Sequence, residues 1–384
     1  MSDKQLPASR SVWQALSPAK PAAPRPASES ESRRHAVATS LAPRQLDALL
    51  VSFGPNLRYL SGFTGSNALL LVLPGRSILF TDPRYQIQAA QEVSCAVTIA
   101  KGPLEADLVA AITRHRVKRV GYEPALMSCE AFRSLESRLP AKASLVAAGG
   151  SVERMRMVKS PSEIDRIRRS VLTNSRAFEQ TVPGVRPGIT ERDLAAELEY
   201  RMRRLGAEKP SFETIVAGGV RSALPHAQPT AARLQPGQLV VVDMGALEDG
   251  YCSDMTRMLH LGTPTAKVKR TYAAVLEAQL AGIDAVHAGA PTAQVDAAAR
   301  NVLKRYGLDR AFIHSTGHGL GLEIHEPPRL GKSDKGRLQA GMAITIEPGV
   351  YLEDFGGIRI EDTVVVTEKG CEILTPTGKE LRLI

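Results

Sequence analysis

Short apolar runs separated by Gly and Pro fill the chain from about residue 46 to residue 122. Runs of this length and composition predict strands at residues 48–51, 68–73, 77–81, 96–100 and 119–122. Segments with apolar positions at helical spacing lie between or after them and predict helices at residues 84–92, 104–115 and 130–139. Because strands and helices alternate, this part of the chain is expected to form an α/β domain.

A different pattern begins at residues 159–163, which read Lys-Ser-Pro-Ser-Glu. Ser160 can cap a helix, Pro161 suits the first helical position, and the Glu163 side chain can bond back to the capping amide. A long helix should start here and end before Pro183, and another should follow over about residues 190–205. We therefore expect a second domain from about residue 156.

Strand-like runs dominate the second domain after these helices. Residues 239–245 and 251–261 predict a hairpin with its turn at Asp249-Gly250, which would place Asp243 and Asp254 opposite each other. Two amphipathic helices and three further strands follow, predicted at residues 265–289, 292–306, 343–347, 358–366 and 372–374. This order predicts an α+β domain in which a strongly curved antiparallel sheet carries helices on one side.

The first 40 residues are rich in Ser, Ala and Pro and hold five prolines before residue 27. Such a composition predicts a disordered tail. Trp13, next to Val12, leaves a short docking segment as the alternative. The predicted organisation is a tail at residues 1–40, a first domain at residues 41–155 and a second domain at residues 156–384.

Charge and composition narrow the classes of function. The 384-residue chain has a formal net charge of +9, but residues 1–40 hold six Lys/Arg against three Asp/Glu, so the rest carries only +6 and has no dense basic run. Binding of nucleic acid is therefore not expected. No apolar run reaches the ~18 to 20 residues that a membrane span requires. Widely spaced cysteines and the lack of a secretory-signal pattern favour a cytoplasmic protein with reduced thiols.

Five candidate metal ligands occur in distinctive local strings between residues 243 and 361 of the chain. The strings are Val-Val-Asp243-Met-Gly, Cys-Ser-Asp254-Met-Thr-Arg, Ser-Thr-Gly-His318-Gly, Ile-Glu347-Pro-Gly and Ile-Glu361-Asp. Each ligand alone is weak evidence, because such a residue is more often an ordinary part of a strand or turn. Together, four carboxylates and one imidazole suit a pair of fairly hard divalent ions. Two such ions about 3.5 to 4 Å apart can activate a water molecule at neutral pH, which predicts a two-metal hydrolase.

Histidines and glycines are concentrated around one of these ligands. His314, His318 and His325 fall within twelve residues that also contain Gly317, Gly319 and Gly321. Glycines allow the backbone to approach a crowded site closely, and imidazoles supply a ligand and hydrogen-bond donors around it. The alternative, a glycine loop with incidental histidines, is disfavoured because the carboxylate strings are present as well.

The five ligand strings resemble those of the pita-bread metallopeptidases, the family of methionine aminopeptidase, prolidase and Xaa-Pro aminopeptidase. Residues 56–66 (Asn-Leu-Arg-Tyr-Leu-Ser-Gly-Phe-Thr-Gly-Ser) and 81–85 (Thr-Asp-Pro-Arg-Tyr) resemble the creatinase-type N-terminal domain of prolidases and Xaa-Pro aminopeptidases. The resemblance implies a pita-bread catalytic domain of the α+β class, preceded by a smaller α/β creatinase-like domain.

The resemblance also implies roles for individual residues. Asp243, Asp254, His318, Glu347 and Glu361 would bind two divalent ions, most typically Mn²⁺, with Co²⁺ or Zn²⁺ as alternatives. Glu347 would also act as proton shuttle. The other carried-over positions are a substrate-side histidine (His226), a histidine that holds the scissile carbonyl (His325), a further pocket histidine (His314) and an arginine that supports a ligand carboxylate (Arg359).

We therefore expect a cytoplasmic, homodimeric Xaa-Pro aminopeptidase, which releases the first residue of a peptide whose second residue is proline. Prolidase, the Xaa-Pro dipeptidase, is the alternative within the family. The alternative from another class is a non-catalytic pita-bread domain that binds peptides or proteins. Such a domain would be expected to have lost metal ligands, and all five are present here.

Overall fold

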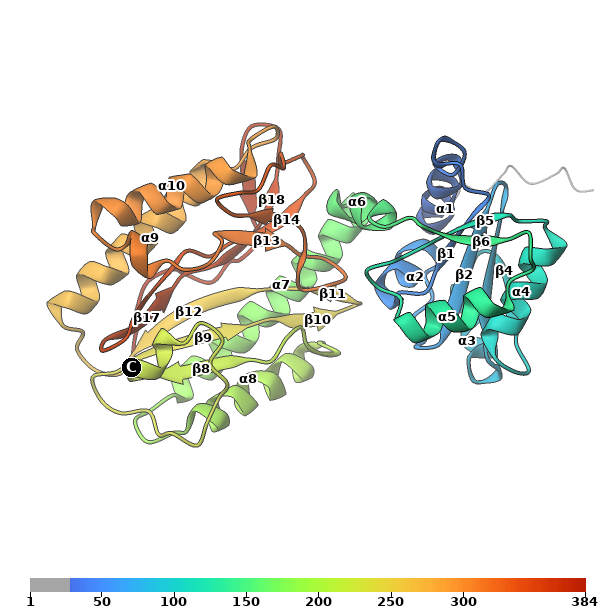
Figure 1. The fold of residues 1–384 in the computed structure, drawn as a ribbon. Helices are drawn as coiled ribbons and strands as arrows, with labels where there is room; N and C mark the ends of the chain where they lie inside the picture. Colours follow the sequence, from blue (N-terminus) through green and yellow to red (C-terminus); the bar gives the residue numbers. More distant parts are fainter. Residues whose placement is uncertain (1–27) are drawn as a thin grey trace, which may run out of the picture.

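The computed structural model describes residues 28–384 and has two lobes joined at helix α6, Ser151–Met157 (Figure 1). The predicted tail up to residue 27, including Trp13, lies outside the described residues. None of the helices in the part that the structure describes is long and apolar enough to cross a membrane.

The first lobe is built on a mixed six-stranded sheet with the order β4-β3-β2-β1-β5-β6. Its strands are β1 (Ala48–Val51), β2 (Ala68–Leu73), β3 (Arg76–Thr81), β4 (Ala96–Ile99), β5 (Arg119–Tyr122) and β6 (Ser144–Ala147). Successive side chains of β1 point to opposite faces, so Leu49 and Leu50 join two separate clusters of buried apolar side chains. The sheet is therefore covered by helices on both faces, as expected for an α/β domain.

The covering helices are divided between the two faces. Helices α1 (Glu29–Thr39), α2 (Gly54–Ser61), α3 (Gln86–Glu92) and α6 pack on one face, and helices α4 (Leu104–Arg114) and α5 (Cys129–Arg138) pack on the other. Helix α2 was not predicted, because its first residues, Gly54 and Pro55, resemble a turn. Proline is in fact favoured in the first turn of a helix, because an N–H group at this place would have no acceptor within the helix.

Helix α1 corrects the last part of the predicted disordered tail, over residues 29–39. Ser28 caps it by accepting a hydrogen bond from the Glu31 amide, and Val37 is buried against the first sheet. Arg33 pairs with Glu163 of the second lobe at 2.8 Å. The last of the prolines that disfavour a helix is Pro26. Because the composition was averaged over 40 residues, it concealed the following segment, which has good helix formers and a buried face.

The second lobe begins with the predicted helix. Ser160 accepts from the Glu163 amide at 3.3 Å and Glu163 accepts from the Ser160 amide at 3.0 Å, which completes the capping box of α7 (Pro161–Thr181). Helices α7 and α8 (Glu191–Leu205) pack on a four-stranded sheet with the order β20-β12-β9-β8. Its strands are β8 (Ile215–Gly218), β9 (Leu239–Met244), β12 (Met255–His260) and β20 (Arg382–Leu383).

The predicted hairpin around Asp249-Gly250 is present, but it changes sheet at its tip. Strands β9 and β12 pair antiparallel, whereas β10 (Ala246–Glu248) and β11 (Tyr251–Cys252) form a separate sheet with β7 (Lys209–Pro210). Asp243 is opposite Thr256. Asp254 is therefore two residues away on the same face, diagonal to Asp243 and not opposite it.

A five-stranded antiparallel sheet with the order β14-β13-β15-β18-β19 completes the lobe. Its strands are β13 (Gly317–Gly319), β14 (Glu326–Leu330), β15 (Ala343–Ile346), β18 (Asp362–Val366) and β19 (Cys371–Ile373), and α9 (Ala266–Asp284) and α10 (Thr292–Arg305) pack against it. The predicted strand at residues 358–366 is interrupted, because β17 (Gly356–Arg359) pairs instead with β16 (Gly349–Leu352). The α+β fold class with its smaller α/β domain is confirmed.

Candidate metal centre

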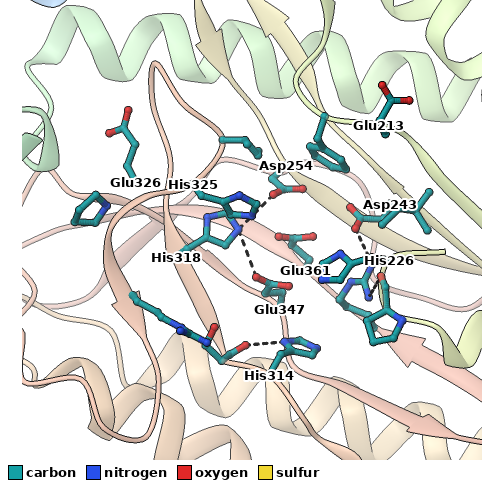
Figure 2. Close-up of a pocket in the computed structure, with 18 of the residues that line it drawn as sticks. Glu213, His226, Asp243, Asp254, His314, His318, His325, Glu326, Glu347 and Glu361 are labelled. Carbon is teal, nitrogen blue, oxygen red and sulfur yellow. Dashed lines mark hydrogen bonds and ion pairs between the residues drawn. The ribbon is translucent and has the colours of Figure 1, made fainter. Parts of the chain in front are cut away.

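The five predicted ligands converge on one cavity of about 830 Å³ in the second lobe (Figure 2). They come from five places in the chain and lie at or next to strand ends: Asp243 on β9, Asp254 before β12, His318 on β13, Glu347 after β15 and Glu361 between β17 and β18. Rigid strands on several sides of the cavity thus hold the side chains, as a metal site requires.

His318 lies between two of the carboxylates. Its Nε2 is 3.6 Å from Asp254 Oδ2 and 3.5 Å from Glu347 Oε1. Its Nδ1 is 3.0 Å from the carbonyl oxygen of Gly319, which can only accept, so Nδ1 carries the proton. Burial lowers the pKa of His318 and favours the neutral ring. Nε2 therefore presents its lone pair to the carboxylates, as a metal-binding imidazole does.

Gly317 explains how His318 comes so close to the neighbouring strand. A Cβ atom at this position would collide with the carbonyl of Thr345 on β15. The His318 amide donates to Thr345 Oγ1 at 3.1 Å. The glycine next to the ligand is thus required by close packing of the two backbones.

Three of the carboxylates each have one buried oxygen without a hydrogen-bond partner among the described residues, which fits a site for cations. Within residues 28–384, the buried oxygens Asp243 Oδ1, Asp254 Oδ1 and Glu361 Oε1 accept no hydrogen bond. Burial raises the pKa values of Asp254 and Glu361 well above their usual range, and repulsion from the neighbouring carboxylates adds to this. One ligand atom each from Asp254, His318 and Glu361 lies within 4.8 Å of the other two. A cation among them would balance this charge.

Arg359 holds two of the predicted ligands in place, one directly and one through Thr256. Its Nη2 donates to Asp243 Oδ2 at 2.6 Å, and its Nε donates to Thr256 Oγ1 at 3.0 Å. The Thr256 hydroxyl in turn donates to Glu361 Oε2 at 2.7 Å. Arg359 and Thr256 therefore fix one oxygen of Asp243 and one of Glu361, and leave the other oxygen of each free for a metal ion.

A tyrosine that the sequence analysis missed extends this network to His314. The hydroxyl of Tyr351 accepts from Arg359 Nη1 at 2.7 Å and lies 2.9 Å from His314 Nε2. His314 Nδ1 is 2.8 Å from the carbonyl oxygen of Ser315, so this nitrogen carries the proton and Nε2 accepts from Tyr351. Burial lowers the pKa of His314, which keeps the ring neutral.

His226 and His325 line the same cavity. The rings of His325 and His318 are in edge-to-face contact, with their centres 4.4 Å apart. Burial lowers the pKa of His325, and the neighbouring His318 and His226 lower it further. A neutral imidazole at this place can donate a hydrogen bond to a bound ligand.

Comparison with known proteins identifies the family. The sequence pattern of metallopeptidase family M24 matches residues 165–368, and that of the creatinase/prolidase N-terminal domain matches residues 33–158. The chain belongs to metallopeptidase family M24. The predicted resemblance to the pita-bread, prolidase-like group is thereby confirmed, and the match from residue 33 agrees with the presence of helix α1.

Relatives of this M24 peptidase carry two kinds of name. The Xaa-Pro dipeptidase of Pyrococcus horikoshii is 37% identical over 339 residues, which cover 88% of this chain and 94% of the relative. Among solved structures, the Xaa-Pro dipeptidase from Bacillus anthracis has a TM-score of 0.90 at 34% identity, and the match covers 92% of this chain and 100% of that one. The X-Pro aminopeptidase from Thermotoga maritima has a TM-score of 0.84 at 37% identity and coverage of 88% and 98%.

The cavity of this M24 peptidase also contains residues that the sequence did not single out. An apolar part of the wall comes from Phe212, Ile215, Pro225 and Ile324. Arg329 on β14 is opposite His318 in the strand register, and its side chain is exposed in the cavity. Within residues 28–384 it forms no ion pair at 4.0 Å or less, so it can bind an anionic group.

Proposed function

We propose that this M24 metallopeptidase hydrolyses the Xaa-Pro peptide bond and prefers dipeptides as substrates. The sequence alone favoured the aminopeptidase. The names of the relatives favour the dipeptidase, which was the alternative. Arg329 is the observation in the site that supports this choice.

Arg329 can receive the free carboxylate of a dipeptide. It lies on the strand next to His318, at one side of the cavity that Asp334 also lines, and forms no ion pair of 4.0 Å or less among the described residues. The other candidate for this contact, Arg359, is buried and already donates to Asp243, Thr256 and Tyr351. An unpaired guanidinium suits a carboxylate because it can bind both oxygens. In a longer peptide, that carboxylate is replaced by a neutral peptide group.

The apolar wall supports the choice of proline. Phe212, Ile215 and Ile324 provide a surface on which a pyrrolidine ring can be buried. A tertiary Xaa-Pro amide has no N–H and a fixed φ angle, so a site for it needs shape and apolar contact more than a hydrogen-bond acceptor.

The donor set suits two divalent ions held by Asp243, Asp254, His318, Glu347 and Glu361. When bound, such a pair would lower the pKa of water and polarise a carbonyl group. We propose Mn²⁺, with Co²⁺ or Zn²⁺ as alternatives, because oxygen ligands predominate.

The remaining steps belong to side chains of this chain. Glu347 lies in the cavity wall, where its carboxylate can take up a proton from the attacking water and pass it to the leaving proline nitrogen. His325 and His226 lie in the cavity wall, where they can donate hydrogen bonds to the scissile carbonyl and its developing negative charge.

The protein is further proposed to be cytoplasmic and homodimeric. Cys95, Cys129, Cys252 and Cys371 are all free thiols, which supports a reducing location such as the cytoplasm. The proposed homodimer rests on the family resemblance alone, and sedimentation analysis of the purified protein would test it.

The substrate preference is tested by the kinetics of the metal-reconstituted protein on Xaa-Pro dipeptides and on matching tripeptides with proline second. We expect a dipeptide preference in kcat/KM of about tenfold or more, about 1.4 kcal/mol of transition-state binding. Arg329→Gln should remove most of this preference by lowering kcat/KM for the dipeptide, while the tripeptide is affected less than about threefold. A wild-type preference for the tripeptide would return the assignment to aminopeptidase.

A further inference from the structure

A buried ionic network joins the two lobes beside the proposed active site. Arg156, in α6, pairs with Glu326 at the start of β14, and Lys159 Nζ lies 3.2 Å from the other oxygen of the same carboxylate. The side chains of Arg156, Lys159 and Glu326 are 3%, 1% and 2% exposed. Burial opposes ionisation of Glu326, but Lys159 and Arg156 outweigh it and lower the pKa of this carboxyl.

The network continues into the first lobe. Arg156 Nη1 donates to Asn56 Oδ1 at 2.7 Å, and Asn56 Nδ2 donates to Glu123 Oε1 at 2.6 Å. Glu123 also accepts from the backbone amide of Ser52 at 2.8 Å, just after β1. A continuous line of hydrogen bonds therefore runs from the end of the first sheet through Arg156 to Glu326.

On the other side, Glu326 anchors the loop that carries His325. Residues 321–325 form bends outside the strand ladders. The Glu326 carboxylate accepts from the Glu323 amide at 3.0 Å, and Arg156 Nη2 also donates to the Glu323 carboxylate at 2.7 Å. Gly321 lies directly against the carboxylate, since a Cβ atom there would be 2.9 Å from it. In Figure 2, Glu326 points away from the ligands, whereas His325 lies against His318.

We propose that Arg156 is a positioning residue, through which the first lobe fixes the loop at residues 321–325 and thereby the place of His325 beside the metal centre. Arg156 does not line the cavity, so it acts only through Glu326 and Glu323. The inference rests on the proposed function, because it needs His325 to contact the substrate. Through this contact the first lobe contributes to catalysis in the second lobe.

Arg156→Lys is the sharpest test, because it retains the charge beside Glu326. The guanidinium of Arg156 donates to Asn56 from one nitrogen and to Glu323 and Glu326 from another. A lysine has a single ammonium nitrogen, which cannot span all three acceptors in this geometry. Arg156→Lys and Arg156→Gln are each made in the wild-type and His325→Ala backgrounds, and kcat/KM on an Xaa-Pro dipeptide and bound metal are measured. The matched control is Arg58→Gln, which removes another contact between the lobes, the 3.3 Å pair with Asp249, without touching this loop.

A residue that acts through His325 must show non-additive effects. We expect Arg156→Lys to lower kcat/KM by about tenfold or more in the wild-type background, but by less than about threefold once His325 is alanine. Bound metal should stay near the wild-type level, and Arg58→Gln should change neither value. Arg156→Gln should give a loss at least as large as that of Arg156→Lys. If it does not fold, the lysine variant answers the question alone.

Two outcomes would overturn the inference. One is an equal loss in both backgrounds, and the other is kcat/KM of Arg156→Lys within twofold of wild type. A metal-loaded wild type that cleaves no Xaa-Pro peptide would overturn the proposed function instead. Activity unaffected by His325→Ala would remove the role of His325 on which both proposals rely.

Discussion

At the scale of single residues, the geometry of the predicted metal site depends on side chains outside the predicted ligand set as much as on the predicted ligands. The predicted ligands and the nearby histidines, which the structure brings to one cavity, could be singled out in the sequence because their strings occur together. Thr256 and Tyr351 could not, because a Thr or a Tyr in a buried strand is ordinary β sequence. Their contacts join residues about 100 positions apart or cross a hairpin, and only the folded chain brings these groups together.

Thr256→Val tests this supporting role, since it replaces a hydroxyl by a methyl group of similar size. It leaves Arg359 Nε and Glu361 Oε2 without their shared partner. We expect metal affinity to fall by about 10- to 100-fold, measured by competition with a chelator. Thr181→Val is the matched control, because it removes a buried hydroxyl bond in α7, which supplies no ligand. Equal metal affinity in the two variants would contradict the role of Thr256.

At the scale of elements, the sequence predicted the helices and strands that have clear periodicity or caps, such as α7 with its capping box. It missed helices α1, α2 and α6 and several short strands, such as β6, β8, β13 and β14. In α1, averaging with the proline-rich segment before it concealed the buried positions. The interruption of the strand predicted at residues 358–366 was also missed, because apolar residues continue through Glu361 without a turn signal, although β17 and β18 belong to different sheets.

Helix α1 leads to a prediction about truncation. A chain that starts at Ser28 keeps all of helix α1. One that starts at Ala42 loses Val37 and Leu41, which are both 2% exposed. Their burial contributes about 1.5–3 kcal/mol each, so we expect a loss of about 3–6 kcal/mol in the free energy of unfolding. Thermal unfolding measures this, and equal midpoints for the two truncated chains would show that α1 does not stabilise the first lobe.

At the scale of the whole molecule, the class and order of the two domains could be predicted, but their contacts could not. Arg156, Asn56 and Glu326 are separated by 100 and 170 positions, and nothing in the sequence pairs one charge with another at that distance. The overall charge of +9 likewise gives no sign of the carboxylates that gather in the cavity.

These carboxylates predict how stability depends on pH and metal. In the metal-free chain, burial raises the pKa values of Asp254, Glu347 and Glu361 above their ordinary values of 3.8 and 4.5. The folded state then holds protons more tightly than the unfolded state, so this contribution to stability is present in acid and is lost as the pH rises through the raised values. Metal ions compete for the ionised groups and act in the opposite direction.

The difference in unfolding temperature between metal-loaded and metal-free protein should therefore grow with pH. We expect it to be near zero at about pH 4.5 and at least about 5 °C at pH 7 with metal well above its Kd. Asp254→Asn should reduce the difference at pH 7. A difference that stays constant between the two pH values would contradict the assignment of these carboxylates as ligands.

Titration of the metal-free protein with Mn²⁺, with bound metal and hydrolysis of an Xaa-Pro dipeptide measured on the same samples, tests the proposed activity most directly. Turnover should be absent at the start, rise with bound metal and level off at two ions per chain. Asp254→Asn should bind less metal and show no turnover. Full dipeptide hydrolysis by the metal-free protein, or by Asp254→Asn without bound metal, would contradict the proposal that this cavity is a two-metal peptidase centre.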